Sequence, residues 1–391
     1  MHQGTPSLLI TLGALLLAGM VMDVVARRLG VPRVTLLILA GMAAGPSGLD
    51  LLPADADAWY PTVSSMALLM VGFLLGRKLA LPVLRAHGRE VLWFSVWEVL
   101  GAAALVVVAL VVAGVPLPLA LVLGGVAPAS APAAIHNVVD EAGGRGPYTE
   151  TLLGVVAVDD AWGLIVFSVL LAAAEALLGS GSVVEPLLFG GAELGGALLL
   201  GVALGVPAAY VTRWIRSGEP MQAEALGLVL VCGGLALWAG VSYLLAAMVL
   251  GTVLANLLHH DSRPFHAIEN VEWPIMVVFF ILAGAEAHLG ELKAVGWLGG
   301  VYVVARAAGL MAGAWAGGSL ARAPRAHRLW MGPGIMPQAG VALGMALVAG
   351  SHLPQWKDTI MAVVVGSTVL FELAGPVLTR TALKRVGEAA R

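Results

Sequence analysis

The stretch YTETLLGVVAVDDAWGLIVFSVLLAAAEA, residues 148–176, constrains how the rest of the chain can fold. It is longer than the roughly 20 apolar residues that a helix needs to cross a bilayer, yet it carries Asp159 and Asp160 near its middle. At 1.5 Å per residue, Asp160 lies about 18 Å from Tyr148, close to the midplane of a hydrocarbon core about 30 Å thick. Carboxylates are costly at this depth, which indicates a proton or cation site and disfavours a merely structural pair.

The whole chain has the composition of a membrane protein. Of its 391 residues, 59% are hydrophobic and only 12% are charged, with a mean hydropathy of +0.93. So little charge excludes a soluble globular protein of this length. The single cysteine, Cys232, excludes a disulfide framework or a cysteine-based metal site. We expect the lipid bilayer as a partner, and neither nucleic acid nor a cofactor.

Thirteen apolar segments of about 20 residues follow one another along the chain. They lie at about 6–26, 32–52, 60–80, 90–113, 118–140, 148–176, 186–212, 221–238, 241–258, 272–290, 294–320, 328–350 and 357–379. With the N-terminus outside, 18 of the 21 Lys and Arg residues fall at one set of segment ends, and only Lys293 and Lys357 fall at the other. The positive-inside rule therefore predicts an outer N-terminus, retained as a first span, and a cytoplasmic C-terminus.

Segments seven positions apart resemble each other. LLILAGMAAGPSG (36–48) is similar to YLLAAMVLGTVLAN (243–256), and proline interrupts GGVAPASAPAA (124–134) and GPGIMPQAGVA (332–342) at matching places. Matched positions disfavour a simple kink in each helix and indicate the inverted repeats of a transporter. The predicted fold is an all-α polytopic membrane protein with a first six-helix repeat at 1–180, a connector helix at 181–217 and a second six-helix repeat at 218–391.

The two interrupted segments are expected to complete the site. Around Pro128 and Pro132 the helix must lose backbone hydrogen bonds. The freed carbonyls and the hydroxyl of Ser130 are oxygen donors suited to a small alkali cation. Pro337 and Gln338 mark the second break, which should face the first and place opposed half-helix charges in mid-membrane.

Arg306 is the only basic residue deep within a predicted span. It lies about 20 Å from a helix start near Lys293. A buried guanidinium keeps its proton and needs an acidic partner, for which Asp159, Glu98 and Glu372 are the candidates. Arg306 is either a fixed countercharge in the ion site or a brace for the broken helices, and the sequence leaves both open.

Three other ionisable residues carry weaker predictions. We expect Glu193 and Glu224 near helix ends or at an interface, outside the ion path. His136 could sense pH, but a hydrogen-bonded structural role is the favoured interpretation.

These stretches together resemble the monovalent cation/proton antiporters, particularly bacterial sodium/proton antiporters with a double-aspartate motif. The resemblance covers nearly the whole chain. It rests on PRVTLLILAGMAAGPSGLDLL (32–52), PASAPAAIHNVVDEAGGRGPYTETLLGVVAVDD (128–160), WPIMVVFFILAGAEAHLGEL (273–292) and MPQAGVALGMAL (336–347). It implies that Asp160 is the main cation/proton carboxylate and that Asp159 is its neighbour at the transported Na⁺.

The resemblance also implies a homodimer in a bacterial inner membrane. Its dimerisation domain would comprise 1–88 and 218–291, and its moving transport core 89–180 and 292–380. The sequence departs from the family at two places. Electrogenic members carry a lysine in a GK-x-x-G context where this chain has Leu310, and the third-span Gly-x-Glu pattern is changed at 76–78 to Gly-Arg-Lys.

The predicted function is secondary active exchange of Na⁺, or of Li⁺ or K⁺, for H⁺ by alternating access, and not an enzymatic reaction. The alternative is a Na⁺-coupled organic solute symporter, which would need a larger polar cavity. An intramembrane aspartyl protease is disfavoured because Asp159 and Asp160 are consecutive and point about 100° apart. If Arg306 pairs with Asp159, only Asp160 exchanges a proton and transport is electroneutral. Pairing with Glu98 or Glu372 would allow electrogenic exchange; we favour the electroneutral case.

Overall fold

The apolar segments of the sequence form helices, since a chain in lipid must satisfy its backbone polar groups within itself. In the computed structural model the described residues are 4–29, 31–46, 48–53, 59–178, 184–212, 222–258, 263–286, 296–338 and 340–389. Their helices are α1 (Gly4–Leu29), α2 (Arg33–Ala44), α3 (Tyr60–Gly76), α4 (Leu81–Val112), α5 (Leu117–Val126), α6 (Pro132–Glu141), α7 (Pro147–Leu178), α8 (Val184–Thr212), α9 (Gln222–Ala239), α10 (Tyr243–Leu257), α11 (Arg263–Glu286), α13 (Gly296–Leu320), α14 (Arg325–Gly334), α15 (Gly340–His352) and α16 (Lys357–Val386).

The predicted all-α membrane fold is confirmed. The described parts of the chain contain no strand, and eight of their helices are long and apolar enough to cross a membrane. Helix occurs within each of the thirteen apolar segments, and the number of crossings stays a prediction. Among the boundaries that differ, the second segment is helical only as far as Ala44. Gly45 and Pro46 follow, and proline disfavours the helical conformation for the residue before it.

Both predicted interruptions are helix breaks. The first separates α5 from α6 at residues 127–131, where Pro128 lies in the break and Pro132 begins α6. The second separates α14 from α15 and contains Pro337, whereas Pro333 remains inside the last turn of α14. Proline fits these places because it lacks the N–H that a continuous helix needs.

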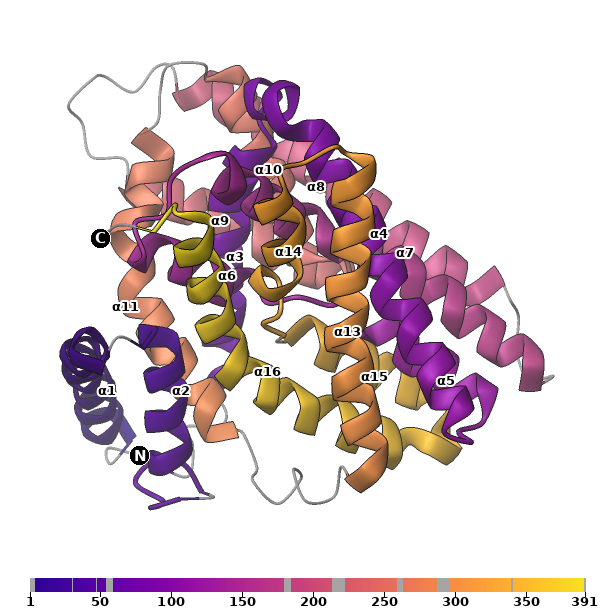
Figure 1. Cartoon of the computed structure of the whole chain (residues 1–391). Helices are drawn as coiled ribbons and strands as arrows, with labels where there is room; N and C mark the ends of the chain where they lie inside the picture. Colours follow the sequence, from indigo (N-terminus) through magenta and orange to yellow (C-terminus); the bar gives the residue numbers. More distant parts are fainter. Residues whose placement is uncertain are drawn as a thin grey trace.

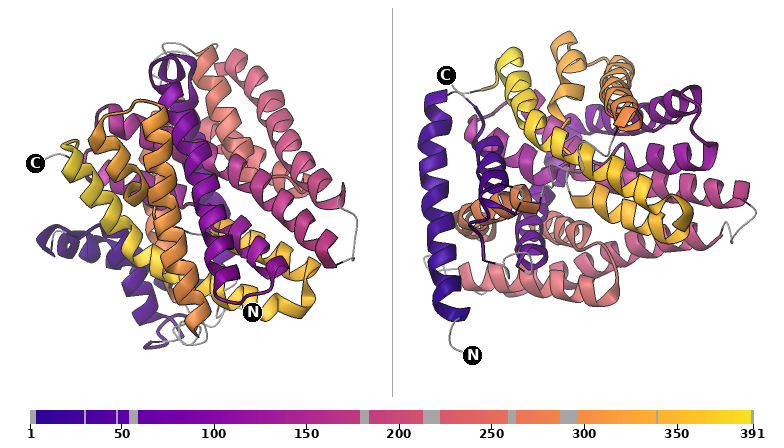
Figure 2. Two further views of the ribbon diagram at one scale, coloured as in Figure 1. Left: turned by 45° about the vertical axis from the view of Figure 1, so that its right-hand side comes forward. Right: turned by 90° about the horizontal axis from the view of Figure 1, so that it is seen from below.

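The helices form two groups joined by α8 (Figure 1). In one group α4 lies along α13, and α5, α7, α14 and α16 pack around this pair. In the other group α2 pairs with α11 and α3 with α10. Helix α1 lies at the edge of the molecule against α2 and α11 (Figure 2). The division into a transport core and a dimerisation domain stays a prediction.

Glycines permit the closest helix contacts in both groups. A Cβ atom at Gly309 or Gly313 of α13 would overlap with the backbone of α4, and Gly317 continues the same face. In the other group, Gly41 of α2 meets the backbone of α11, and Gly251 of α10 meets that of α3. Small residues at such spacings let helix backbones approach closely in lipid, where van der Waals contact drives association.

Candidate ion-binding site

The central helix of the site is α7, which carries both aspartates without a break. Asp159 is 2% exposed and Asp160 is 5% exposed. Consecutive helical residues project about 100° apart, so the two carboxylates have different surroundings. None of their four oxygen atoms has a hydrogen-bond partner in the described part of the chain.

Asp159 faces a cluster of buried polar groups. Glu98 of α4, Ser130 of the first break and Arg306 of α13 lie close to it. The carboxylate of Glu98 and the hydroxyl of Ser130 are buried and interact with Asp159, but none of these contacts has regular hydrogen-bond geometry. Buried oxygens are normally satisfied, so this cluster has capacity for a proton or a cation.

Arg306 holds both helix breaks together. Its Nε donates to the carbonyl oxygen of Ala127 at 2.8 Å, and its two terminal nitrogens donate to Ala129 and Met336, each at 2.9 Å. The guanidinium also lies 4.2 Å from the ring centre of Phe371. The planar fork of arginine suits several acceptors at once, which favours the interpretation of Arg306 as a brace.

Two predictions about this region are wrong in detail. Arg306 makes no ion pair within 4 Å to any carboxylate in the described chain; Glu98 and Asp159 act on it from a greater distance. Glu372 lines a small cavity beside Ser130. The carbonyls of Ala127 and Ala129 accept from Arg306, so they are not free cation ligands as expected. Which acceptor a buried arginine reaches depends on helix packing, which the sequence does not reveal.

The second break adds Gln338 to the polar cluster. Its side chain is fully buried beside the hydroxyl of Tyr302, with which it interacts without regular hydrogen-bond geometry. Pro337, next to it, packs so closely against Gly375 of α16 that a Cβ atom there would overlap with the proline. The break is therefore fixed by backbone contact as well as by Arg306.

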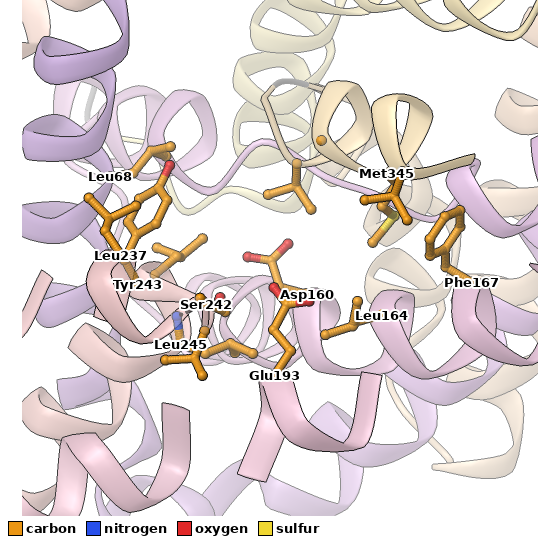
Figure 3. Close-up of a pocket in the computed structure, with 16 residues that line it drawn as sticks. Leu68, Asp160, Leu164, Phe167, Glu193, Leu237, Ser242, Tyr243, Leu245 and Met345 are labelled. Carbon is orange, nitrogen blue, oxygen red and sulfur yellow. Dashed lines mark hydrogen bonds between the residues drawn. The ribbon is translucent and has the colours of Figure 1, made fainter. Parts of the chain in front are cut away.

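Asp160 faces a cavity of about 360 Å³. Figure 3 shows its carboxylate directed into this space, with Tyr243 on one side and Met345 on the other. The cavity extends from Asp160 to the turn between α9 and α10, and most of its walls are apolar. The other carboxylate in the cavity lining is that of Glu193 of α8, a residue that we expected near a helix end or at an interface.

The described residues include no group of three or more His, Cys, Asp or Glu side chains that could hold a metal ion. Sparse oxygen ligands fit a monovalent ion that binds and leaves. Residues 12–384 match the family described as "Sodium/hydrogen exchanger, transmembrane". The chain belongs to this family.

Individual relatives of this exchanger have low sequence identity to it. The ammonium/H(+) antiporter subunit AmhT of Alkalihalophilus pseudofirmus is 25% identical over 288 residues, which cover 72% of this chain and 71% of the relative. Two structures of the sodium proton antiporter MjNhaP1 from Methanocaldococcus jannaschii share its fold. One has a TM-score of 0.74 at 19% identity and covers 98% of this chain and 100% of the other. The second has a TM-score of 0.79 at 18% identity and covers both chains fully.

Charged contacts connect the two helix groups away from the residues that line the cavity. The backbone N–H of Arg33 in α2 donates to the carboxylate of Glu141 in α6 at 2.7 Å, and Arg380 of α16 approaches the same carboxylate at 3.4 Å. His136 of α6 lies 3.7 Å from Glu272 of α11. These contacts lie near the basic segment ends, where the two groups meet.

Proposed function

We propose that this chain exchanges a monovalent cation for a proton by alternating access, with the carboxylate of Asp160 taking up either ion in turn. One observation supports this above all: a carboxylate that is 5% exposed and without a hydrogen-bond partner in the described chain faces a cavity. An isolated charge in a medium of low dielectric is very costly, so this group must take up a proton or a cation. Competition for one site couples the two movements.

Asp159, Ser130 and Glu98 form the remainder of the proposed site. Their unpartnered oxygens supply hard ligands next to Asp160, which suit alkali cations better than softer metals. Arg306 balances part of this negative charge and braces the breaks at Pro128 and Pro337 through carbonyl contacts. Gln338 lies buried beside Tyr302, and Glu372 lines the small cavity beside Ser130.

The two helix groups provide the parts for alternating access. The group containing α4, α7 and α13 carries the aspartates and would move against the group of α2, α3, α10 and α11, which would hold a homodimer together. We place the N-terminus outside and the C-terminus in the cytoplasm of a bacterial inner membrane, following the basic residues. The cavity beside Asp160 then faces outward, and the contacts of Glu141 and His136 close the cytoplasmic side.

The identity of the cation is inferred from the names of the relatives and from the ligand atoms. The family is named for sodium, MjNhaP1 is called a sodium proton antiporter, and AmhT is called an ammonium/H(+) antiporter. We take Na⁺ as the first candidate because carboxylate and hydroxyl oxygens surround Asp159, the neighbour of Asp160. The organic solute symporter finds no support, since the matches reported above are antiporters and the cavity walls are mostly apolar.

Purified protein in proteoliposomes tests the proposal. A pH gradient is imposed, Na⁺, Li⁺, K⁺ or NH4⁺ is added, and proton movement is followed with a pH-sensitive dye. Liposomes carrying Asp160→Asn record passive leaks, including the unaided passage of ammonia through lipid. We expect at least one cation to move protons faster, and saturably, in wild-type vesicles. Equal rates with both proteins for every cation would reject the proposal.

A further inference from the structure

Glu193 shares the cavity of Asp160, although it lies on the helix that connects the two groups. The described lining comes from α3, α7, α8, α9, α10, α15 and the α9–α10 turn, and these described residues include no basic side chain. The carboxylates among them are Asp160 and Glu193, and Figure 3 shows both side chains at the same space. The remaining side chains are mostly apolar, such as Leu164, Phe167 and Val348.

Close helix contacts set the position of Glu193. Gly190 of α8 lies against Ser168 of α7, and Gly196 lies against Val241 of the α9–α10 turn; a Cβ atom at either glycine would overlap with its neighbour. These two contacts, one before and one after Glu193 along the helix, hold α8 close to α7 and to the α9–α10 turn. Its side chain is consequently half-buried at the cavity wall.

Glu193 has no partner that would account for its position. No ion pair or hydrogen bond to it occurs within the described residues. An ionisable side chain within a membrane span generally pairs with another group or lines the path of an ion. The nearby Asp160, nine-tenths buried and equally unpartnered, is directed into the same space. The two carboxylates therefore face the same cavity.

We infer that Glu193 forms a second, transient site for the monovalent cation or proton, between Asp160 and the side of the α9–α10 turn. This inference rests on the proposed function. A cation that enters the apolar cavity loses part of its hydration, and the Glu193 carboxylate offsets that cost before the ion reaches Asp160. A proton released from Asp160 leaves past the same group. The site serves only one side of the membrane, because the cavity lies on one side of Asp160.

Sided transport measurements test this role. Initial rates of ²²Na⁺ uptake, or of uptake of the cation found active, are measured in right-side-out and everted vesicles under an outward proton gradient. Glu193→Gln should raise the apparent KM about tenfold in right-side-out vesicles, as expected for the loss of one charge at a partly buried site. In everted vesicles the KM should match wild type. Glu193→Asp restores the charge and should recover most of the affinity.

Glu224→Gln is the matched control, because Glu224 lies exposed in the first turn of α9 and should leave both values unchanged. A wild-type KM for Glu193→Gln from both sides, or an equal rise from both sides, would overturn the inference while leaving Asp160 in its role. A rise confined to everted vesicles would support Glu193 and reverse the proposed orientation. Wild-type vesicles without exchange would reject the proposed function together with the inference.

Discussion

The two neighbouring aspartates face regions of opposite character. Asp159 faces the crossing region, defined here by Glu98, the breaks at 127–131 and 335–338, and Arg306, which supplies a permanent positive charge. Asp160 faces the cavity, whose described lining residues include no basic side chain. A carboxylate with a fixed countercharge nearby has little reason to exchange ions, whereas one without must bind something. We therefore expect Asp160 to exchange the ions and Asp159 to contribute a fixed negative charge beside it.

Asparagine at each aspartate in turn gives the strongest test of that division. Asp160→Asn should abolish cation-dependent proton movement in proteoliposomes, because an amide can neither release a proton nor hold the cation by charge. Asp159→Asn should retain exchange with an apparent KM raised on the order of tenfold, since one nearby charge is lost. Both variants should elute from gel filtration as wild type does. Exchange that survives Asp160→Asn and disappears in Asp159→Asn would invert the assignment.

Arg306→Gln should cause the next largest effect, on stability. It removes the guanidinium contacts to Ala127, Ala129 and Met336 and leaves buried carbonyls unsatisfied. Hydrogen bonds from charged groups contribute about 1.5–3 kcal/mol each, so we expect a loss of about 3 kcal/mol or more. Thermal unfolding in detergent, followed by tryptophan fluorescence, measures this loss. Arg306→Lys should recover only part of it, because a lysine cannot reach three acceptors in one plane.

Arg89→Gln provides the control for this measurement. Arg89 is an exposed arginine that approaches a single carbonyl, that of Leu320, at 3.4 Å, and its replacement should hardly change the unfolding temperature. Equal shifts for Arg306→Gln and Arg89→Gln would mean that Arg306 is not a brace.

A smaller effect is expected for Ser130→Ala, which removes one unpartnered oxygen from the crossing region. The apparent cation KM should rise about threefold to tenfold with little change in maximal rate, because one ligand is lost and the carboxylates remain. Ser319→Ala is the matched control, since its exposed hydroxyl is already bonded to the Trp315 carbonyl at 2.7 Å. If both variants keep the wild-type KM, Ser130 does not contact the cation.

Local chemistry made much of this architecture predictable. The length of the apolar segments predicted the helices, and the prolines at 128, 132 and 337 predicted the two breaks. The depth of Asp159 and Asp160 followed from a residue count along one uninterrupted helix. Gly45 and Pro46 indicate the early end of α2, whereas hydropathy alone predicts a longer segment.

Features that depend on helix packing could not be predicted from the sequence. The acceptors of Arg306 come from two breaks about 200 residues apart in the chain, and no local pattern selects carbonyls over carboxylates. Glu193 joins the cavity because Gly190 and Gly196 let α8 approach its neighbours. A lone mid-helix glutamate between glycine pairs was the available signal, but it does not indicate which side of α8 faces the cavity.

Membrane voltage should have the smallest effect on the rate of exchange, because of the charges in the crossing region. The guanidinium of Arg306 does not deprotonate, and the position where electrogenic relatives of this type carry lysine holds the buried Leu310. No lysine among the described residues that line the cavity of Asp160 is then available to release a second proton when the cation binds. We therefore expect one proton from Asp160 to exchange for one monovalent cation, with no net charge crossing the membrane. A potential set with K⁺ and valinomycin should therefore leave the rate of Na⁺/H⁺ exchange unchanged in either polarity. Leu310→Lys is the informative comparison, because a group that can lose a proton in that place should introduce voltage dependence. Strong voltage dependence of the wild-type protein would contradict the one-to-one exchange and would make Asp159 a second exchanging carboxylate.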